Sequence, residues 1–297
     1  KRWQKMMYDL IEVTPKKNNK KIIITSIIIL AIIIIFTILL VKPSQFFNKQ
    51  QNNISDNSII SSNNVNNKTK HVSTVNMNPV YTEAGKELVK NIYHSEEKTV
   101  YLTFDDGPSK TVTPLILDLL KQEDVKATFF VLGSRAELNP EILKREYKEG
   151  HYIANHGYSH IYGNIYSTPQ AVLDEYNKTQ DIIKNILGTD YDGHLFRFPG
   201  GSSGGKYATI KSEAKILLEQ NNIAYVDWNS LSNDAAGAKT KEAIIENTKS
   251  TIGNKNSVVI LMHDAGDKIL TYEALPEIIA YLKEQGYKFK NFYSIMK

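Results

Sequence analysis

The chain has 297 residues, 41% of them hydrophobic, which is enough to bury a substantial core and leaves one or two domains open. It has no cysteine, which excludes disulfides and thiolate metal sites and leaves histidine and carboxylates as the strong metal ligands. Residues 1–97 carry 13 Lys and Arg against 7 Asp and Glu, a net charge of +6. Because the whole chain has a net charge of +4, the other 200 residues carry about −2. We therefore expect no nucleic-acid partner, and no protein partner is evident.

Residues 22–41 form an uncharged apolar run of 20 residues, the length that spans a bilayer core. Seven Lys and Arg precede it against two acidic residues, whereas only Lys42 follows closely. The positive-inside rule therefore predicts a single-pass transmembrane helix in the cell membrane, with a cytoplasmic tail at 1–21 and the rest of the chain extracellular. A cleaved signal peptide is the alternative, although this run is long for one and is followed by no small-residue cleavage site.

Residues 44–79 contain ten Asn, six Ser and three Gln, a composition too polar to fold alone. We interpret 42–97 as a disordered extracellular linker that ends in a lead-in helix, which would let an anchored domain reach an extended surface polymer. The helical spacing within 80–97 is carried by Ala84, Leu88 and Ile92. This helix is expected either to pack on the following domain or to lead into it.

From residue 98 to 297, short apolar runs alternate with amphipathic stretches. The predicted strands are 99–104, 127–132, 152–154, 194–198, 223–228 and 257–262. The predicted helices are 114–122, 140–148, 169–186, 207–220, 241–252 and 272–284. This alternation predicts an α/β domain of parallel strands and crossover helices, with enough chain for a closed or nearly closed barrel.

Asp105 and Asp106 close the first predicted strand and are followed by Gly107 and Pro108. Two carboxylates at the end of a buried strand are costly because they repel each other and are partly desolvated. The cost is tolerable if a cation binds one carboxylate while the other transfers protons. The alternative is an ordinary turn in which one Asp caps the next helix.

His156 and His160 follow the third predicted strand, four residues apart. On one helical turn both imidazoles would face the same side and could bind a divalent metal ion, the alternative being a pair of surface or capping histidines. Because His156 and Asp106 both follow strands, they should reach one rim of the barrel and complete a His-His-Asp set with an open coordination position. Asp105, beside the metal ligand, is then the available base.

Three further groups follow strands toward the same rim. His263 ends the last predicted strand, where it suits a general acid, although a helix-capping Asp264 beside an incidental histidine is the alternative. Arg197 ends the fourth strand, and its guanidinium could hold a carboxylate through paired hydrogen bonds. The N–H of Gly200 is a candidate donor to a developing oxyanion, unless 200–205 is simply a flexible loop.

Asp227, Trp228 and Asp234 follow the fifth predicted strand. A buried carboxylate there could orient and charge the imidazole of His263, while the indole could wall a groove. A solvated loop acid is the alternative for either Asp.

These motifs resemble, in order and over about 200 residues from 98 to 297, those of the polysaccharide deacetylase family, the NodB-homology or carbohydrate esterase family 4 domain. Residues 103–108 resemble the first motif, which implies Asp105 as catalytic base and Asp106 as metal ligand. Residues 156–160 resemble the second motif, which implies His156 and His160 as the other metal ligands.

The remaining motifs of the family match less uniformly. Residues 197–200 are similar to the third motif, but the family often has Tyr where Gly200 stands, so only a backbone oxyanion contact carries over. Residues 261–264 resemble the fifth motif and imply His263 as the acid, with Leu261 in the substrate site. The fourth motif is altered: Asp234 is the preferred partner of His263, Asp227 is the alternative, and a changed groove wall is implied.

The resemblance implies a distorted (β/α)7-type barrel and a hydrolase that depends on a divalent metal ion, with Zn²⁺ expected and Co²⁺ or another divalent ion as alternatives. The implied reaction removes N-acetyl groups from amino sugars of cell-wall polysaccharide, peptidoglycan or a chitooligosaccharide-like chain. An O-acetyl esterase of wall sugars or xylan and a non-catalytic glycan-binding module are the rival interpretations.

Overall fold

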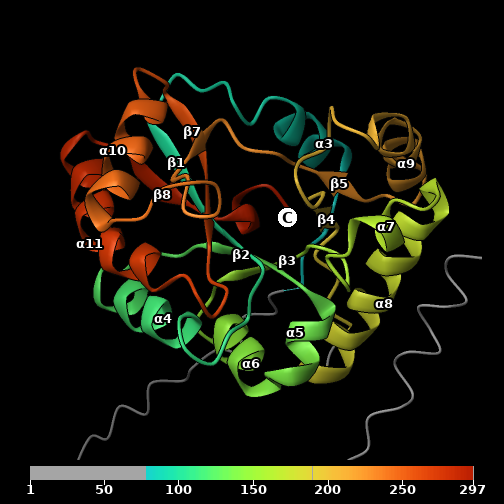
Figure 1. Ribbon diagram of the computed structural model, residues 1–297. Coiled ribbons are helices and arrows are strands. Elements are labelled where there is room, and N and C mark those ends of the chain that lie inside the picture. Colours follow the sequence, from blue (N-terminus) through green and yellow to red (C-terminus); the bar gives the residue numbers. More distant parts are fainter. Residues whose placement is uncertain (1–77, 189, 297) are drawn as a thin grey trace, which may run out of the picture. The chain divides into compact units, whose positions relative to one another are not determined.

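Eight parallel strands form the sheet, and β1 lies in its interior (Figure 1). The computed structural model describes residues 78–188 and 190–296. Within these ranges the strands are β1 (Thr99–Asp105), β2 (Thr128–Val131), β3 (Tyr152–Asn155), β4 (Leu195–Phe196), β5 (Ala224–Tyr225), β6 (Ser230–Leu231), β7 (Ser257–His263) and β8 (Lys288–Lys290). Their order is β5-β4-β3-β2-β1-β7-β6, and β8 pairs with the start of β1.

The helices follow the predicted alternation with strands. In the described ranges they are α3 (Glu83–Lys90), α4 (Thr113–Gln122), α5 (Gly133–Leu138), α6 (Pro140–Lys148), α7 (Tyr162–Ile165), α8 (Pro169–Leu187), α9 (Ala208–Gln220), α10 (Lys241–Ile252), α11 (Ile269–Glu284) and the 3-10 helix η1 (Phe292–Ser294). The six predicted helices and six predicted strands all occur; α6 and α10 have the predicted ends, and the others are shifted at one or both ends. The elements missed are α5, α7, β6, β8 and η1, which have six residues or fewer, too few to establish a period.

The sheet curls into a half-barrel instead of closing. The strands β5 and β6 end the described sheet and do not pair with each other. The prediction of a parallel (β/α)7-type barrel is thus confirmed for strand direction and crossovers, whereas the expectation of near closure was wrong.

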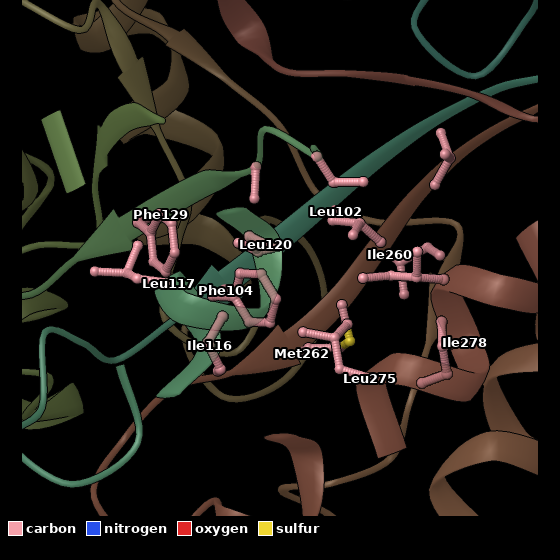
Figure 2. Close-up of a cluster of buried hydrophobic side chains, with 14 of the residues drawn as sticks. Leu102, Phe104, Ile116, Leu117, Leu120, Phe129, Ile260, Met262, Leu275 and Ile278 are labelled. Atoms are coloured by element: carbon pink, nitrogen blue, oxygen red, sulfur yellow. The ribbon is translucent and has the colours of Figure 1, made fainter. Parts of the chain in front are cut away.

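Side chains alternate between the two faces of the central strands, as a period of two requires. On β1 the even-numbered residues pack outward against helices, and β7 does the same. Figure 2 shows this outer core between the sheet and α4 and α11, with labelled residues that include Leu102, Phe104, Ile116, Ile260, Met262 and Leu275. Fully burying one such side chain contributes about 1.5–3 kcal/mol. The odd-numbered residues of β1 and β7 therefore point into the half-barrel.

The end of the chain fills the inside of the half-barrel (Figure 1). Phe292, Ile295 and Met296 are buried in a second cluster with inward residues such as Tyr101 of β1 and Phe130 of β2. These apolar side chains fill the interior where β1 begins. The polar groups of a site are therefore expected at the carboxyl ends of the strands.

The lead-in segment packs on the domain across the open side of the sheet. The carbonyl of Tyr81 accepts a hydrogen bond from Asn222, just before β5, and that of Ile92 accepts one from Ser257, where β7 begins. The predicted inner face of this helix was wrong, because Ala84 and Leu88 are exposed. The side that faces the domain is formed by Gly85 and Val89, each one residue after the predicted position. Ile92, just after the end of α3, is buried as predicted.

The predicted membrane helix at 22–41 and the linker up to residue 77 lie outside the described residues. Among the helices between residues 78 and 296, none is long and apolar enough to cross a membrane.

Candidate metal centre and active site

The strands β1, β3 and β7 end at one rim of the half-barrel. Asp105 is the register partner of His263 across β1 and β7. On the other side, β1 pairs with β2 and β2 with β3, which ends at Asn155 immediately before His156. The rim predicted for the carboxylates and histidines is therefore present.

Asp106, His156 and His160 form a cluster in which one ligand atom of each lies within 4.8 Å of the others. Oδ1 of Asp106 is 3.6 Å from Nε2 of His156 and 3.5 Å from Nε2 of His160. Ligand atoms held about 2.0–2.2 Å from a tetrahedral metal ion lie about 3.4 Å apart, close to these distances. Oδ1 of Asp106 is also buried without a hydrogen-bond partner in the described part of the chain, which is costly unless a cation binds it. The residues thus fit a divalent ion.

The ring of His156 is held in the orientation and protonation that a metal ligand needs. Its Nδ1 lies 2.8 Å from the backbone carbonyl of Arg197, so Nδ1–H donates and Nε2 is left to face Asp106. Burial lowers the pKa of His156 to about 3, the carboxylate of Asp106 opposing that shift. The imidazole is therefore neutral, as metal binding requires.

The histidines converge from a loop, and the predicted helical turn was wrong. Residues 156–160 contain no helix, and Gly157 has a φ of 81°. His160 and Asp106 themselves adopt left-handed backbone, with φ of 55° and 74°. Asp and His enter this region more readily than most residues, but at a cost of order 1–3 kcal/mol each. Two of the three candidate ligands thus carry backbone strain.

Asp105 is buried beside the guanidinium of Arg197, which is fully buried. Nη1 of Arg197 donates to Oδ1 of Asp105 at 2.8 Å and to Oγ1 of Thr103 at 2.7 Å. Its other donors reach the carbonyls of Val226 and Asp227, so the expected paired hydrogen bonds to one carboxylate are not formed. Burial raises the pKa of Asp105, and Arg197 opposes that rise. A carboxylate made more basic in this way suits a proton acceptor.

His263 forms an ion pair with Asp234, the preferred partner of the two predicted. Nδ1 of His263 is 2.8 Å from Oδ1 of Asp234. Burial alone would lower the pKa of His263, but the bond to Asp234 outweighs it and the pKa rises to about 9. Asp227 instead binds the backbone N–H and hydroxyl of Ser202, at 2.9 and 2.7 Å.

Asp264 joins the loop after β1 to the loop after β7 and does not cap a helix. It is fully buried, and its carboxylate accepts a hydrogen bond from the hydroxyl of Thr113 in α4. Its backbone N–H donates to the backbone carbonyl of Asp105 at 3.1 Å. A Cβ on Gly107 would lie 2.1 Å from Oδ2 of Asp264, so the first motif requires glycine here. Burial raises the pKa of Asp264 to about 7.

Comparison with known proteins identifies the family. Residues 93–217 match the family model described as polysaccharide deacetylase. A peptidoglycan-N-acetylglucosamine deacetylase of Bacillus cereus is 35% identical over 216 residues, which cover 71% of this chain and 75% of that protein. The chain belongs to the polysaccharide deacetylase family.

Two further relatives support the same assignment. A putative polysaccharide deacetylase of Bacillus subtilis is 38% identical over 209 residues, 68% of this chain and 71% of that one. The structure of a carbohydrate esterase family 4 (CE4) esterase from Streptococcus mutans superposes with a TM-score of 0.64 at 33% identity, covering 72% of this chain and 92% of that one.

In this deacetylase the third motif is completed by a residue that the sequence did not single out. Gly200 is exposed with a φ of 72°, and a Cβ there would lie 2.4 Å from the hydroxyl of Tyr162. The Tyr162 ring lies 5.6 Å from that of His160 and also packs on Tyr166 and Tyr207. Tyr162 thus takes the space beside the metal cluster into which a side chain at 200 would grow. Its position two residues after His160 was the available signal.

The deacetylase also carries Trp228 and Leu261 at this rim. Trp228 is partly exposed, and its ring lies 5.9 Å from Cζ of Arg197. Leu261 is partly exposed on β7, on the inward face that also carries His263, and pairs with Leu231 of β6. Their contact with substrate stays a prediction.

Two hydroxyl groups that support the site were also missed. Thr103 binds Arg197 and lies two residues before Asp105, so the period of two on β1 could have indicated it. Thr271 of α11 donates to Oδ2 of Asp234 at 2.8 Å. It is 37 residues away in sequence, and no local pattern connects the two.

Proposed function

We propose that this chain is a metal-dependent hydrolase that removes N-acetyl groups from amino sugars of cell-wall polysaccharide, with N-acetylglucosamine of peptidoglycan as the expected target. The observation that carries the proposal is the position of Asp105. It is the register partner of His263 on one side, and its Oδ2 is 3.8 Å from Nε2 of His156 on the other. A base, an acid and a metal cluster within one rim are the parts that amide hydrolysis requires.

Asp106, His156 and His160 would hold the ion, and Zn²⁺ is expected because two imidazoles and one carboxylate with an open position are typical of catalytic zinc, with Co²⁺ as the alternative. When bound, such an ion supplies a Lewis acid that polarises the acetamide carbonyl and acidifies water.

The residues of the chain would then carry the protons and the charge. Asp105 takes a proton from the attacking water, and Arg197 keeps that carboxylate in place through its bond to Oδ1. The N–H of Gly200 donates to the oxyanion as it develops. His263 donates a proton to the sugar nitrogen, so that the C–N bond breaks and the amine leaves.

The protonation of His263 favours an amide over an ester substrate. An amine leaves a tetrahedral intermediate only after its nitrogen is protonated, whereas an alcohol is the better leaving group. A pKa near 9 keeps His263 protonated at neutral pH, which suits the amide. The similarity to a CE4 esterase keeps O-acetyl hydrolysis as the second candidate.

The proposal places the enzyme outside the cell. The apolar run at 22–41 and the Asn- and Ser-rich linker after it would anchor the domain and give it reach into the wall. Fractionation of cells that express the full chain, with protease added from outside, tests this proposal. Loss of the domain to external protease is expected, and its protection in intact cells would contradict it.

Acetate release from peptidoglycan, chitopentaose and O-acetylated xylan, each with Zn²⁺ or Co²⁺ added, tests the reaction. The expected result is acetate from the N-acetylated glycans and none after the substitution Asp105→Asn, with folding of that variant checked by circular dichroism. Acetate from xylan alone would favour the esterase. Glycan binding without acetate from any substrate would favour a non-catalytic module.

A further inference from the structure

A hollow of about 470 Å³ adjoins the metal cluster on the side of α5. Asp106 lines it, so the hollow begins at one of the candidate metal ligands. Its other walls are the β1–α4 loop from Pro108 to Lys110, the α5 residues Arg135 and Leu138, and the β7–α11 loop from Ala265 to Asp267. A polymer whose acetamide reaches the metal cluster has neighbouring sugar units that must lie over adjacent surface, and this hollow is such a surface.

The walls of the hollow are held together by buried hydrogen bonds. Asn139 is buried, and its Nδ2 donates to the carbonyl of Pro108 at 2.9 Å and to that of Arg135 at 3.1 Å. The hydroxyl of Ser109 donates to the carbonyl of Asp264 at 2.7 Å. The three walls are thus fixed relative to one another, and the shape does not depend on exposed side chains alone.

With a divalent ion bound at Asp106, the lining of the hollow would carry a net positive charge and favour an anion. Arg135 and Lys110 are exposed, and neither forms an ion pair with any residue in the described part of the chain. The two carboxylates in the hollow are accounted for: Asp267 pairs with Lys268 at 2.9 Å, and Asp106 belongs to the metal cluster. Two unpaired cations in a concave site raise the local concentration of anionic ligands.

The hollow is also lined by an exposed apolar side chain, that of Leu138 at the end of α5. Leu138 is 63% exposed. A ligand that matches this surface has a carboxylate beside a small apolar group. The lactyl ether of N-acetylmuramic acid has this combination in peptide-free strands, where one carbon carries a methyl group and a free carboxylate. Where a stem peptide is attached, the lactyl carboxyl is an amide and the peptide supplies the carboxylates instead.

We propose that the hollow is a subsite for the carboxylate-bearing substituent of the muramic acid unit next to the sugar being deacetylated. This inference rests on the proposed function and narrows its substrate class from amino-sugar polymers in general to anionic peptidoglycan strands. Arg135 binds the carboxylate, Lys110 adds attraction at longer range, and Leu138 packs against the apolar part of the substituent.

The test compares kcat/KM for acetate release from three substrates: peptide-free strands of alternating N-acetylglucosamine and N-acetylmuramic acid, the same strands with methyl-esterified lactyl groups, and neutral chitopentaose. The full chain is used with Zn²⁺ added. Arg135→Gln and Lys110→Gln should each lower kcat/KM on the anionic strands ~3- to 10-fold and leave chitopentaose unchanged. Methyl esterification should lower the wild-type value by a similar factor, and added salt should reduce the preference for anionic strands.

Lys121→Gln is the matched control, since Lys121 is an exposed lysine in the last turn of α4, outside the hollow. An equal loss on the anionic strands and chitopentaose, or no loss on any muramic acid-containing strand with or without its stem peptide, would overturn the subsite. Strands that retain their stem peptides separate the two carboxylate sources: an effect seen only with peptide identifies the peptide carboxylates, and one seen without it identifies the lactyl group. A wild-type chain that releases no acetate from any substrate refutes the proposed function itself, which keeps the two failures apart.

Discussion

The carboxylate of Asp234 binds His263 at two points: Oδ1 lies 2.8 Å from Nδ1 of the ring, and Oδ2 accepts the backbone N–H of the same residue at 2.8 Å. The hydroxyl of Thr271 donates to Oδ2 as well. These bonds fix the orientation of the imidazole and keep a proton on Nδ1, so the proton that can move to substrate is the one on Nε2.

Asp234→Asn should shift the alkaline limb of the kcat/KM profile to lower pH. In the wild type the acid form of His263 is present below its raised pKa of about 9, so activity should fall as pH rises through that value. Without the negative charge of Asp234, burial lowers the pKa and the acid form is lost earlier. Acetate release measured across pH checks the shift. Asp227→Asn is the control, because that carboxylate binds Ser202, and an unmoved limb in Asp234→Asn would contradict the role of His263 as acid.

Chelation should abolish acetate release, and added Zn²⁺ or Co²⁺ should restore it. His156→Gln and His160→Gln should each lower metal affinity by more than about tenfold, since each removes one of three candidate ligands. Metal content after dialysis, measured by mass spectrometry, checks this, and His94→Gln is an exposed control. Stoichiometric metal retained by either variant would exclude that histidine as a ligand.

Arg197→Met should lower the free energy of unfolding by about 3–5 kcal/mol, because it leaves the buried carboxylate of Asp105 without its cation. Urea denaturation with chelator present measures this without a contribution from metal. Arg145→Met, which removes partly exposed ion pairs with Asp118 and Glu149, should cost only about 0–1 kcal/mol.

A double variant separates charge from packing at Arg197. Replacing Asp105 by Asn as well removes the unpaired charge, so the Arg197→Met, Asp105→Asn double variant should be more stable than Arg197→Met alone. If the second substitution recovers nothing, the loss comes from the other contacts of Arg197: its hydrogen bonds to Thr103 and to the carbonyls of Val226 and Asp227, and its packing against Phe130, whose ring centre lies 3.9 Å from Cζ of Arg197.

The site residues were predictable from the sequence wherever a carboxylate or a histidine ends a buried strand. The continuous apolar run before Asp105 and the run before His263 indicated buried parallel strands, and parallel strands bring their carboxyl ends to one rim. That reasoning placed the carboxylates and histidines together without any knowledge of distance.

Pairing across loops was not predictable in the same way. Asp227 and Asp234 both follow β5, and only the short strand β6 between them, at Ser230–Leu231, decides which one turns toward His263. Two residues give no period to recognise. The spacing of the two histidines correctly suggested that they converge, but it did so by assuming a helical turn. The loop that carries His160 instead reaches Asp106 through left-handed backbone.

Gly200→Ala should lower both stability and acetate release, because the new methyl group meets the hydroxyl of Tyr162 and the backbone is left-handed there. Gly204→Ala separates the backbone strain from the steric clash, since Gly204 also has a positive φ, of 70°, but has nothing within 4 Å of an added Cβ. It should cost only the backbone strain, about 1–2 kcal/mol.

Removing the Tyr162 ring should rescue the first substitution and not the second. The Tyr162→Ala, Gly200→Ala double variant should be more stable than the sum of its single effects predicts, with a coupling of roughly 0.5–3 kcal/mol. Tyr162→Ala combined with Gly204→Ala should be additive. Urea denaturation and acetate release on all five variants check both outcomes. Equal coupling at the two glycines would mean that Tyr162 does not occupy the space beside Gly200, and the third motif would then lack the side chain that Tyr162 supplies.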